Sequence, residues 1–152
     1  YDRVVSLESA FHYVPREKFF REAHRVLKKG GKLVMADIIY NDTTSVNIFN
    51  TINRNAFSEM FAIPDANKIG VREYTKQLED IGFRVKVEDI SDKTFKPYYK
   101  YFFDNLTCPD DFGLPSPIFS MLKYACQIYI NKLCGGTNGF TYVIAVCEKC
   151  ED

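Results

Sequence analysis

The stretch that decides the fold is ESAFHYVPREKFFREAHRVLKKGGKLVMAD, residues 8–37. It begins as a polar loop, continues with helical periodicity, passes two glycines and enters an apolar run. The segment before it, DRVVSL at 2–7, is short and rich in valine, as expected of a buried strand. Strand, helix and strand in under forty residues predict a right-handed parallel crossover, the unit from which α/β sheets are built.

The predicted helix spans residues 16–29. Its apolar residues fall on one helical face; they are Phe19, Phe20, Ala23, Val26 and Leu27. Gly30 with Gly31 is expected to supply a left-handed C-cap. The following run, KLVMADII at 32–39, is almost continuously apolar, which is typical of a strand covered on both faces.

The rest of the chain predicts a helix, a second helix, a strand, a helical insert in two pieces and a last strand. These elements are expected over residues 46–63, 72–83, 83–90, 94–133 and 140–149. Gly82 stands at the C′ position of the second helix. The aromatic and methionine content of the first helix fits either core packing or the wall of an apolar pocket.

The composition restricts the classes of protein to which the chain can belong. The 152 residues are 46% hydrophobic and 15% aromatic, which suffices for one packed core. Twenty basic and twenty acidic side chains cancel, so we expect a small neutral or apolar partner and no nucleic acid. The sequence has neither an apolar stretch long enough for membrane insertion nor a signal peptide, so a cytoplasmic location is expected. Because the chain begins at Tyr1 without a methionine, we expect a fragment.

The cysteines do not form a disulfide framework. They are odd in number and confined to the second half: Cys108, Cys126, Cys134, Cys147 and Cys150. The last two form one C-x-x-C, but zinc normally needs four ligands, and the only histidines, His12 and His24, are far away in sequence. We therefore expect no metal site.

Ligands of open parallel sheets bind outside the carboxyl ends of the strands. One such end is Leu7-Glu8-Ser9 with the loop to Val14, and the other is Asp37 with the loop to Ser45. Glu8 and Asp37 are therefore expected on neighbouring strands at the same edge of the sheet.

The stretch YDRVVSLESAFHYVPREKFFREAHRVLKKGGKLVMADI, residues 1–38, resembles the fourth strand, following helix and fifth strand of class I S-adenosylmethionine-dependent methyltransferases. The likeness is greatest to the small-molecule branch that includes sterol, tocopherol and natural-product methyltransferases. It rests on the F/Y-D-x-V opening, the E-x-x-RVL-K-x-GG-x-L middle and the AD ending. Further along, YTKQLEDIGFRVKVEDIS resembles the next helix and sixth strand of the family, and FTYVIAVCEKC its final antiparallel strand.

The resemblance implies an α/β fold, a partial doubly wound Rossmann-like sheet made of the family's fourth to seventh strands. Residues 1–152 would form the carboxy-terminal part of one domain, with helical inserts at about 40–68 and 94–133. The second insert would lie where a lid excludes water. Lys29 replaces the usual proline of the glycine turn.

The family's glycine-rich loop and its ribose-binding acidic residue are absent, and no G-x-G motif occurs. Without the amino-terminal strands of the domain, the strand at 2–7 would expose an apolar edge. We therefore expect those strands to come from a longer chain.

The implied function is S-adenosylmethionine-dependent methyl transfer to a small, apolar acceptor, with the acceptor atom left open. The alternative is a non-catalytic methyltransferase-like module that associates with another chain. By resemblance, Leu7, Glu8 and Ser9 border the methionine and sulfonium part of the cofactor, and the loop to Tyr13 faces the acceptor. Glu8 could equally pin the loop by accepting backbone N–H bonds.

His12 is the predicted catalytic residue, because histidine titrates near neutrality and can take a proton from the acceptor. Its alternative role is to hydrogen-bond a backbone carbonyl and shape the loop. Asp37 could orient acceptor or loop, or else cap the turn after its strand. The predicted acceptor contacts, each of which could instead be core packing, are the aromatic residues Phe11, Tyr13, Phe57 and Phe61.

Overall fold

The computed structural model describes residues 1–42, 51, 54, 55, 58, 59, 61–104, 118 and 139–150. With η for a 3₁₀ helix, the elements are β1 (Arg3–Leu7), η1 (Ala10–His12), α1 (Arg16–Val26), β2 (Lys32–Tyr40), η2 (Asp65–Asn67), α3 (Val71–Asp80), β3 (Phe83–Asp89), α4 (Ser91–Asp104) and β4 (Phe140–Lys149). They belong to two compact units, Tyr1–Ile90 with Asn138–Asp152 and Ser91–Thr137. The insert expected at 94–133 falls within the second unit, where α4 begins three residues earlier than predicted.

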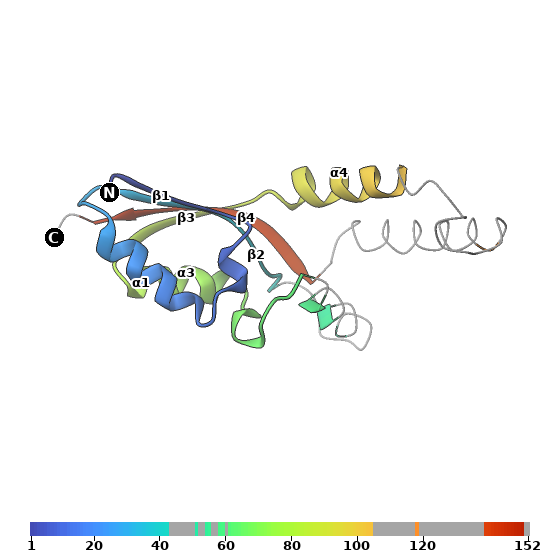
Figure 1. Ribbon diagram of the computed structural model, residues 1–152, viewed down its shortest axis with the longest axis horizontal. Coiled ribbons are helices and arrows are strands. Elements are labelled where there is room, and N and C mark those ends of the chain that lie inside the picture. The colour runs from blue at the N-terminus through green and yellow to red at the C-terminus, as the bar shows by residue number, and fades with distance from the viewer. Residues whose placement is uncertain are drawn as a thin grey trace. The chain divides into compact units, whose positions relative to one another are not determined.

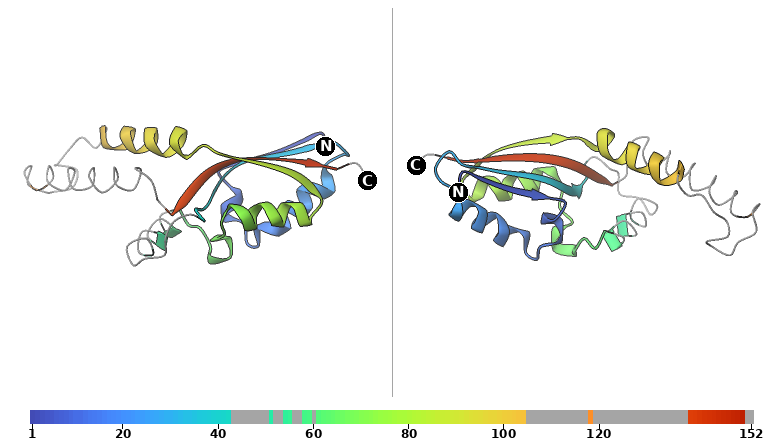
Figure 2. Two further views of the ribbon diagram at one scale, coloured as in Figure 1. Left: turned by 180° about the vertical axis from the view of Figure 1, so that it is seen from behind. Right: turned by 45° about the horizontal axis from the view of Figure 1, so that its top comes forward.

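The sheet of the first unit has the strand order β1-β2-β4-β3. β1 and β2 are parallel, and β4 runs antiparallel to both β2 and β3. Helices α1 and α3 lie on the same face of the sheet (Figures 1 and 2). The predicted parallel crossover and the antiparallel last strand are thus confirmed.

The core lies between the sheet and these two helices. Because side chains alternate along a strand, every second residue of β2 enters it. The buried cluster contains Phe20, Ala23, Leu33, Met35, Ile39, Tyr74, Leu78, Phe83, Val143, Ala145 and Cys147. Fully burying one large aliphatic or aromatic side chain contributes about 1.5–3 kcal/mol, so this layer supplies the main stabilisation of the unit.

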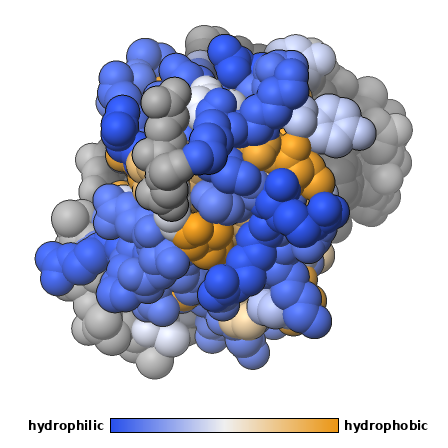
Figure 3. Space-filling view, turned by 90° about the vertical axis from the view of Figure 1, so that its left-hand side faces the viewer, coloured by the Kyte–Doolittle hydropathy of each residue, from blue (hydrophilic) through white to orange (hydrophobic). Residues whose placement is uncertain are grey.

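The other face of β1 is open. Val5 and Leu7 are 74% and 71% exposed, whereas Ser6 between them is buried on the helix side. Figure 3, which views the molecule from the side on which both termini lie, also shows hydrophobic residues open between hydrophilic ones. Isolated apolar side chains are common on surfaces, but two at alternate positions of an edge strand mark a face suited to further packing.

One predicted helix end is wrong. α1 ends at Val26, because Leu27 leaves the helix in an extended conformation (φ −72°, ψ 140°) and is buried in the core. Gly30, with φ +70°, serves instead in the turn that the Gly31 N–H closes by donating to the Lys28 carbonyl at 2.9 Å. At the end of α3 the prediction is confirmed, since Gly82 follows it with φ +107°.

Some predicted features lie outside the described residues. Of the helix expected at 46–63, the described residues at 51, 54, 55, 58 and 59 are helical, whereas residues 61–63 are not, so the predicted end of this helix is wrong. Phe57, Cys108, Cys126 and Cys134 fall in the undescribed ranges, as does the second piece of the insert except for Ile118. In the described part of the chain, no helix is long and apolar enough to cross a membrane.

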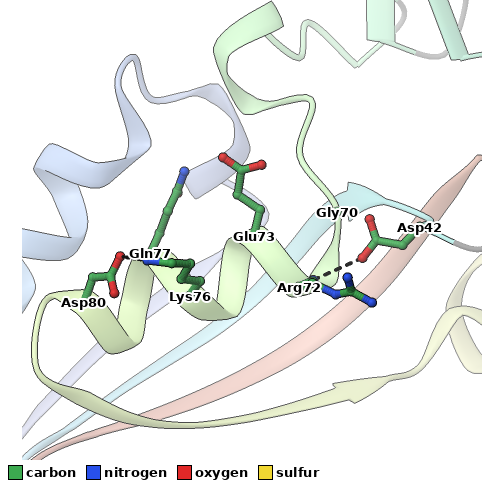
Figure 4. A pocket seen from close by; sticks show the side chains of 7 residues that line it. All are labelled: Asp42, Gly70, Arg72, Glu73, Lys76, Gln77 and Asp80. Carbon is green, nitrogen blue, oxygen red and sulfur yellow. Dashed lines mark hydrogen bonds and ion pairs between the residues drawn. The ribbon is translucent and has the colours of Figure 1, made fainter.

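The first turn of α3 is capped by a side chain from another element. The residue before the helix is Gly70, which has no side chain, and the Asp42 carboxylate accepts a hydrogen bond from the Arg72 N–H at 3.1 Å (Figure 4). A Cβ atom on Gly70 would stand 1.4 Å from Asp42 Oδ1. Gly70 is therefore required to admit the capping carboxylate.

We expect Asp42→Ala to lower the free energy of unfolding by about 1 kcal/mol, because it leaves an N-terminal N–H of α3 without its acceptor. Urea denaturation measures the change. The matched control is Asp80→Ala, which removes an exposed carboxylate paired with Lys76 on the same helix and should change stability by less than about 0.5 kcal/mol. Equal losses in the two variants would contradict the capping role.

Candidate functional site

The candidate site lies where β1 ends beside β2. Leu7 pairs with Ala36, and the N–H of Glu8 donates to the Ala36 carbonyl at 3.0 Å. This register brings Glu8 level with Asp37 on the neighbouring strand, as predicted. Asp37 is not at the end of its strand, however, because β2 continues to Tyr40.

Glu8 turns the chain out of the strand with φ +48°, a conformation that is uncommon for residues other than glycine. Its carboxylate accepts a hydrogen bond from the Tyr142 hydroxyl of β4 at 2.5 Å. Burial, followed by the hydrogen bond to Glu8, raises the pKa of Tyr142, so the phenol keeps its proton and remains a donor. Glu8 is thus held by a phenol from a strand on the far side of β2.

Leu7 and Ser9, the other predicted cofactor contacts, differ in their surroundings. The Leu7 side chain is open, as described above. The Ser9 hydroxyl lies 2.9 Å from the Ser6 hydroxyl and accepts a hydrogen bond from the Tyr13 hydroxyl at 3.2 Å. Ser9 therefore ties the start of the loop to its end.

The His12 ring is exposed on the loop, and its Nδ1 lies 3.2 Å from the carbonyl oxygen of Ala62. A carbonyl oxygen can only accept, so Nδ1 carries the hydrogen, and in the neutral ring Nε2 is the acceptor nitrogen. Ala62 itself has φ +48°. The loop-shaping contact and a basic Nε2 are therefore compatible, since they use different ring nitrogens.

Asp37 is completely buried (0% exposed), 3.6 Å from Arg16, which is 1% exposed. Arg16 Nη1 and Asp37 Oδ2 have no hydrogen-bond partner among the described residues, so the two form an ion pair without a hydrogen bond between these atoms. Burial raises the pKa of Asp37, and the Arg16 charge and contacts with Tyr74 and the Ile38 and Phe11 amides oppose this rise. The Asp37 carboxylate thus interacts with Arg16, with Tyr74 and with backbone amides in the interior, and it is not exposed to solvent.

Asn67, at the end of η2, was not predicted. Its side chain is 2% exposed, and Nδ2 donates to the carbonyl of Phe11 at 2.9 Å and to that of Tyr13 at 2.7 Å. Its own backbone carbonyl accepts from Arg16 Nη2 at 3.4 Å. In the sequence Asn67 belongs to the polar run DANK, which gives no sign of burial.

The predicted aromatic contacts are not equivalent. Phe11 is buried, while Tyr13 is partly exposed, with its ring edge against Phe19 at 5.1 Å between centroids. Phe61 is half-buried. Tyr13 and Phe61 therefore keep part of their surface accessible, and the burial of Phe11 favours a packing role beneath the loop.

A surface groove elsewhere contains none of the predicted site residues. It runs along α3 and is lined by Asp42, Gly70, Arg72, Glu73, Lys76, Gln77 and Asp80 (Figure 4). Cys147 is buried within the sheet, and burial raises the pKa of its thiol to about 12. The groove along α3 and the Cys147 thiol therefore contribute no residue to the candidate site in the loop after β1.

Comparisons with known proteins point to one family. The family described as a methyltransferase domain matches residues 1–35. Erythromycin 3''-O-methyltransferase of Saccharopolyspora erythraea is 38% identical over 110 residues, 70% of this chain and 36% of its own length. The chain thus spans about a third of the length of this curated relative.

Solved structures share the fold at low sequence identity. Geranyl diphosphate C-methyltransferase from Streptomyces coelicolor, solved with Mg²⁺, geranyl diphosphate and S-adenosyl-L-homocysteine, has a TM-score of 0.67 and 17% identity, and the match covers 97% of this chain and 47% of that one. Phosphoethanolamine N-methyltransferase 2 of Haemonchus contortus, in complex with S-adenosyl-L-methionine, has a TM-score of 0.68 and 13% identity, with 99% and 34% coverage. The expected Rossmann-like α/β fold is thereby confirmed.

Proposed function

Because the chain belongs to the class I S-adenosylmethionine-dependent methyltransferase family, we propose that it forms part of an enzyme that methylates a small, apolar acceptor. The observation that carries this proposal is the loop after β1. It holds an exposed His12 whose Nδ1 is hydrogen-bonded to Ala62, and it begins with the Glu8 carboxylate at the carboxyl end of β1. A base and an anionic group at this edge suit the transfer of a methyl group from a cation.

Leu7, Glu8 and Ser9 are proposed to hold the methionine end of the cofactor. The open Leu7 side chain offers apolar contact, and the Glu8 carboxylate is an anion suited to the neighbourhood of a sulfonium. When bound, S-adenosylmethionine supplies an electrophilic methyl carbon, whose bond to sulfur breaks as the acceptor atom bonds to it and S-adenosylhomocysteine is left. Positioning of the two reactants supplies much of the rate of such a displacement.

His12 is proposed to take the acceptor's proton on Nε2 as the new bond forms, and later to release it to water. The hydrogen bond from Nδ1 to Ala62 supports this, because it fixes the tautomer and the ring orientation. Tyr13 and Phe61 would contact the acceptor.

The amino-terminal strands of the domain are proposed to precede this chain in a longer protein. Two facts support this: the chain spans about a third of a curated relative, and β1 exposes apolar side chains at the edge of its sheet.

The free thiols of Cys147 and Cys150 suit a reducing compartment, and we propose that the enzyme is located in the cytoplasm.

Calorimetric titration with S-adenosylmethionine tests the function. Two polypeptides are compared, residues 1–152 alone and the same chain extended upstream through the missing strands. We expect binding to the extended polypeptide only, because the glycine-rich half of the cofactor site would lie in the added segment. Binding to neither would refute the enzyme and favour the non-catalytic module.

The acceptor is then sought by measuring release of S-adenosylhomocysteine with apolar small molecules. Erythromycin-related alcohols come first, because the relative with 38% identity is named for O-methylation of erythromycin. Product mass identifies whether oxygen, nitrogen or carbon receives the methyl group.

A further inference from the structure

We propose that Asn67 is a positioning residue that fixes the direction of His12 toward the acceptor. This inference rests on the proposed function, since it assigns His12 the role of base. Asn67 does not itself reach the reacting atoms, because its side chain is buried beneath the loop.

The contacts of Asn67 bracket His12 on both sides. Its Nδ2 has two hydrogens, and it donates to the carbonyls of Phe11 and Tyr13, the residues immediately before and after His12. The Phe11 carbonyl belongs to the peptide plane that precedes His12, and the Tyr13 carbonyl belongs to the plane that follows Tyr13. With both carbonyls held by one amide group, the backbone segment of His12 and Tyr13 is anchored at both ends, which restricts the direction of the His12 Cα–Cβ bond.

The same segment also holds the ring. The Ala62 carbonyl, five residues before Asn67, accepts the hydrogen of His12 Nδ1 at 3.2 Å. Residues 62–67 thus contact His12 at the ring and its two neighbours at the backbone. Ala62 adopts φ +48°, a conformation that alanine rarely takes and that is found where surrounding structure enforces it.

The position of Asn67 is itself fixed from two directions. Its backbone N–H donates to the Pro64 carbonyl at 2.9 Å, closing η2, and its carbonyl accepts from the buried Arg16. Arg16 is paired with Asp37 and lies over the Tyr74 ring at 5.4 Å. Asn67 therefore connects the buried cluster of Arg16, Asp37 and Tyr74 to the exposed loop that carries His12.

The test uses the full-length protein and the acceptor found by the assay above. Asn67→Asp keeps the shape of the side chain and removes both donor hydrogens. Asn67→Ser shortens the side chain, so that it can no longer donate to both the Phe11 and the Tyr13 carbonyl. We expect each to lower kcat by about ten- to hundredfold, as displacement of a catalytic group does, with the dissociation constant for S-adenosylmethionine within about twofold of the parent. In a His12→Ala background the same substitutions should lower kcat no further, because the group they position is gone.

Asp42→Ala is the matched control. It removes another contact between a side chain and a distant backbone N–H in the same unit, so it should lower the melting temperature and leave kcat unchanged at temperatures well below melting. Using two Asn67 variants guards against failure of one to fold.

An unchanged kcat, or an equal loss of kcat with and without His12, would overturn the positioning role. Absence of S-adenosylmethionine binding by the unsubstituted protein would instead refute the proposed function, which calorimetry detects before any variant is made. Failure of the positioning role of Asn67 and failure of the proposed function are therefore distinguished by different measurements.

Discussion

Replacing His12, the proposed general base, with alanine in the full-length protein is expected to lower kcat by about a hundredfold or more, the usual contribution of such a group. The affinity for S-adenosylmethionine should stay unchanged, because the predicted cofactor contacts Leu7, Glu8 and Ser9 do not include the His12 ring. Stopped assays of S-adenosylhomocysteine give kcat, and calorimetry gives the dissociation constant.

A second substitution separates catalysis from loop shape. Asparagine at position 12 keeps an N–H donor for the Ala62 carbonyl, which the histidine contacts through Nδ1 at 3.2 Å, but it has no basic nitrogen. If His12 is the base, His12→Asn loses as much kcat as His12→Ala. Recovery of turnover in His12→Asn would show that the histidine only shapes the loop.

The other histidine provides a control of the same residue type. His24 lies on α1 with its ring edge against Phe83, at 4.9 Å between centroids. We expect His24→Ala to leave kcat unchanged, since this contact is with the end of the sheet at which β3 begins. A comparable loss of kcat in both histidine variants would point to a general effect on folding and contradict the assigned role.

The sequence predicted the elements that local pattern determines. The apolar runs of β1 and β2, the helical face of α1 and the alternation of β3 are short-range signals, and each lies within a few residues of its prediction. The prediction that Glu8 and Asp37 lie on neighbouring strands followed from the same information, because a strand-helix-strand crossover places its two strands parallel in one sheet; β2, however, continues past Asp37 to Tyr40.

The contacts of the candidate site could not be predicted in this way. Glu8 is held by Tyr142, 134 residues away, and His12 by Ala62, 50 residues away. Asn67 sits in a run that reads as a polar turn, and only its two carbonyl partners show why it is buried. Such contacts depend on how loops meet after the sheet has formed, and no local periodicity encodes them.

Asp37 illustrates the same limit for charge. The sequence left Asp37 to orient the acceptor or the loop, or else to cap the turn after its strand. The structure buries the carboxylate beside Arg16, at the first position of α1, a partner that the sequence analysis did not identify. Burial of both partners follows from the loop before α1, which brings the start of the helix over the sheet.

Substitution of either member of this pair alone is expected to be severely destabilising. We expect Arg16→Met and Asp37→Leu each to lower the free energy of unfolding by about 3–5 kcal/mol, because each leaves one charge buried without its partner. That is a large part of the stability of an ordinary domain. Urea denaturation of the full-length protein, followed by far-ultraviolet circular dichroism, measures the loss.

The double variant Arg16→Met/Asp37→Leu should recover most of that loss. The paired atoms are 3.6 Å apart, and two of the buried nitrogens of Arg16, Nε and Nη1, lack hydrogen-bond partners among the described residues. A pair of this kind gains little over its desolvation cost, and apolar side chains of similar size fill the same space. Additive losses in the double variant would contradict this, and would show that the two side chains contribute through separate contacts.

The two single variants should also differ in their dependence on pH. Burial already raises the pKa of Asp37, and removing the opposing Arg16 charge raises it further. A carboxyl whose folded pKa exceeds its unfolded value stabilises the fold at low pH, and that contribution is lost as the pH rises through the folded value. The deficit of Arg16→Met should therefore grow as the pH rises above about 4, the ordinary range of a carboxyl. The deficit of Asp37→Leu should instead shrink, because the parent protein loses the contribution of its own Asp37 as the pH rises and this variant has no such group. Parallel curves for the two variants would mean that Asp37 does not take up a proton when its partner is removed.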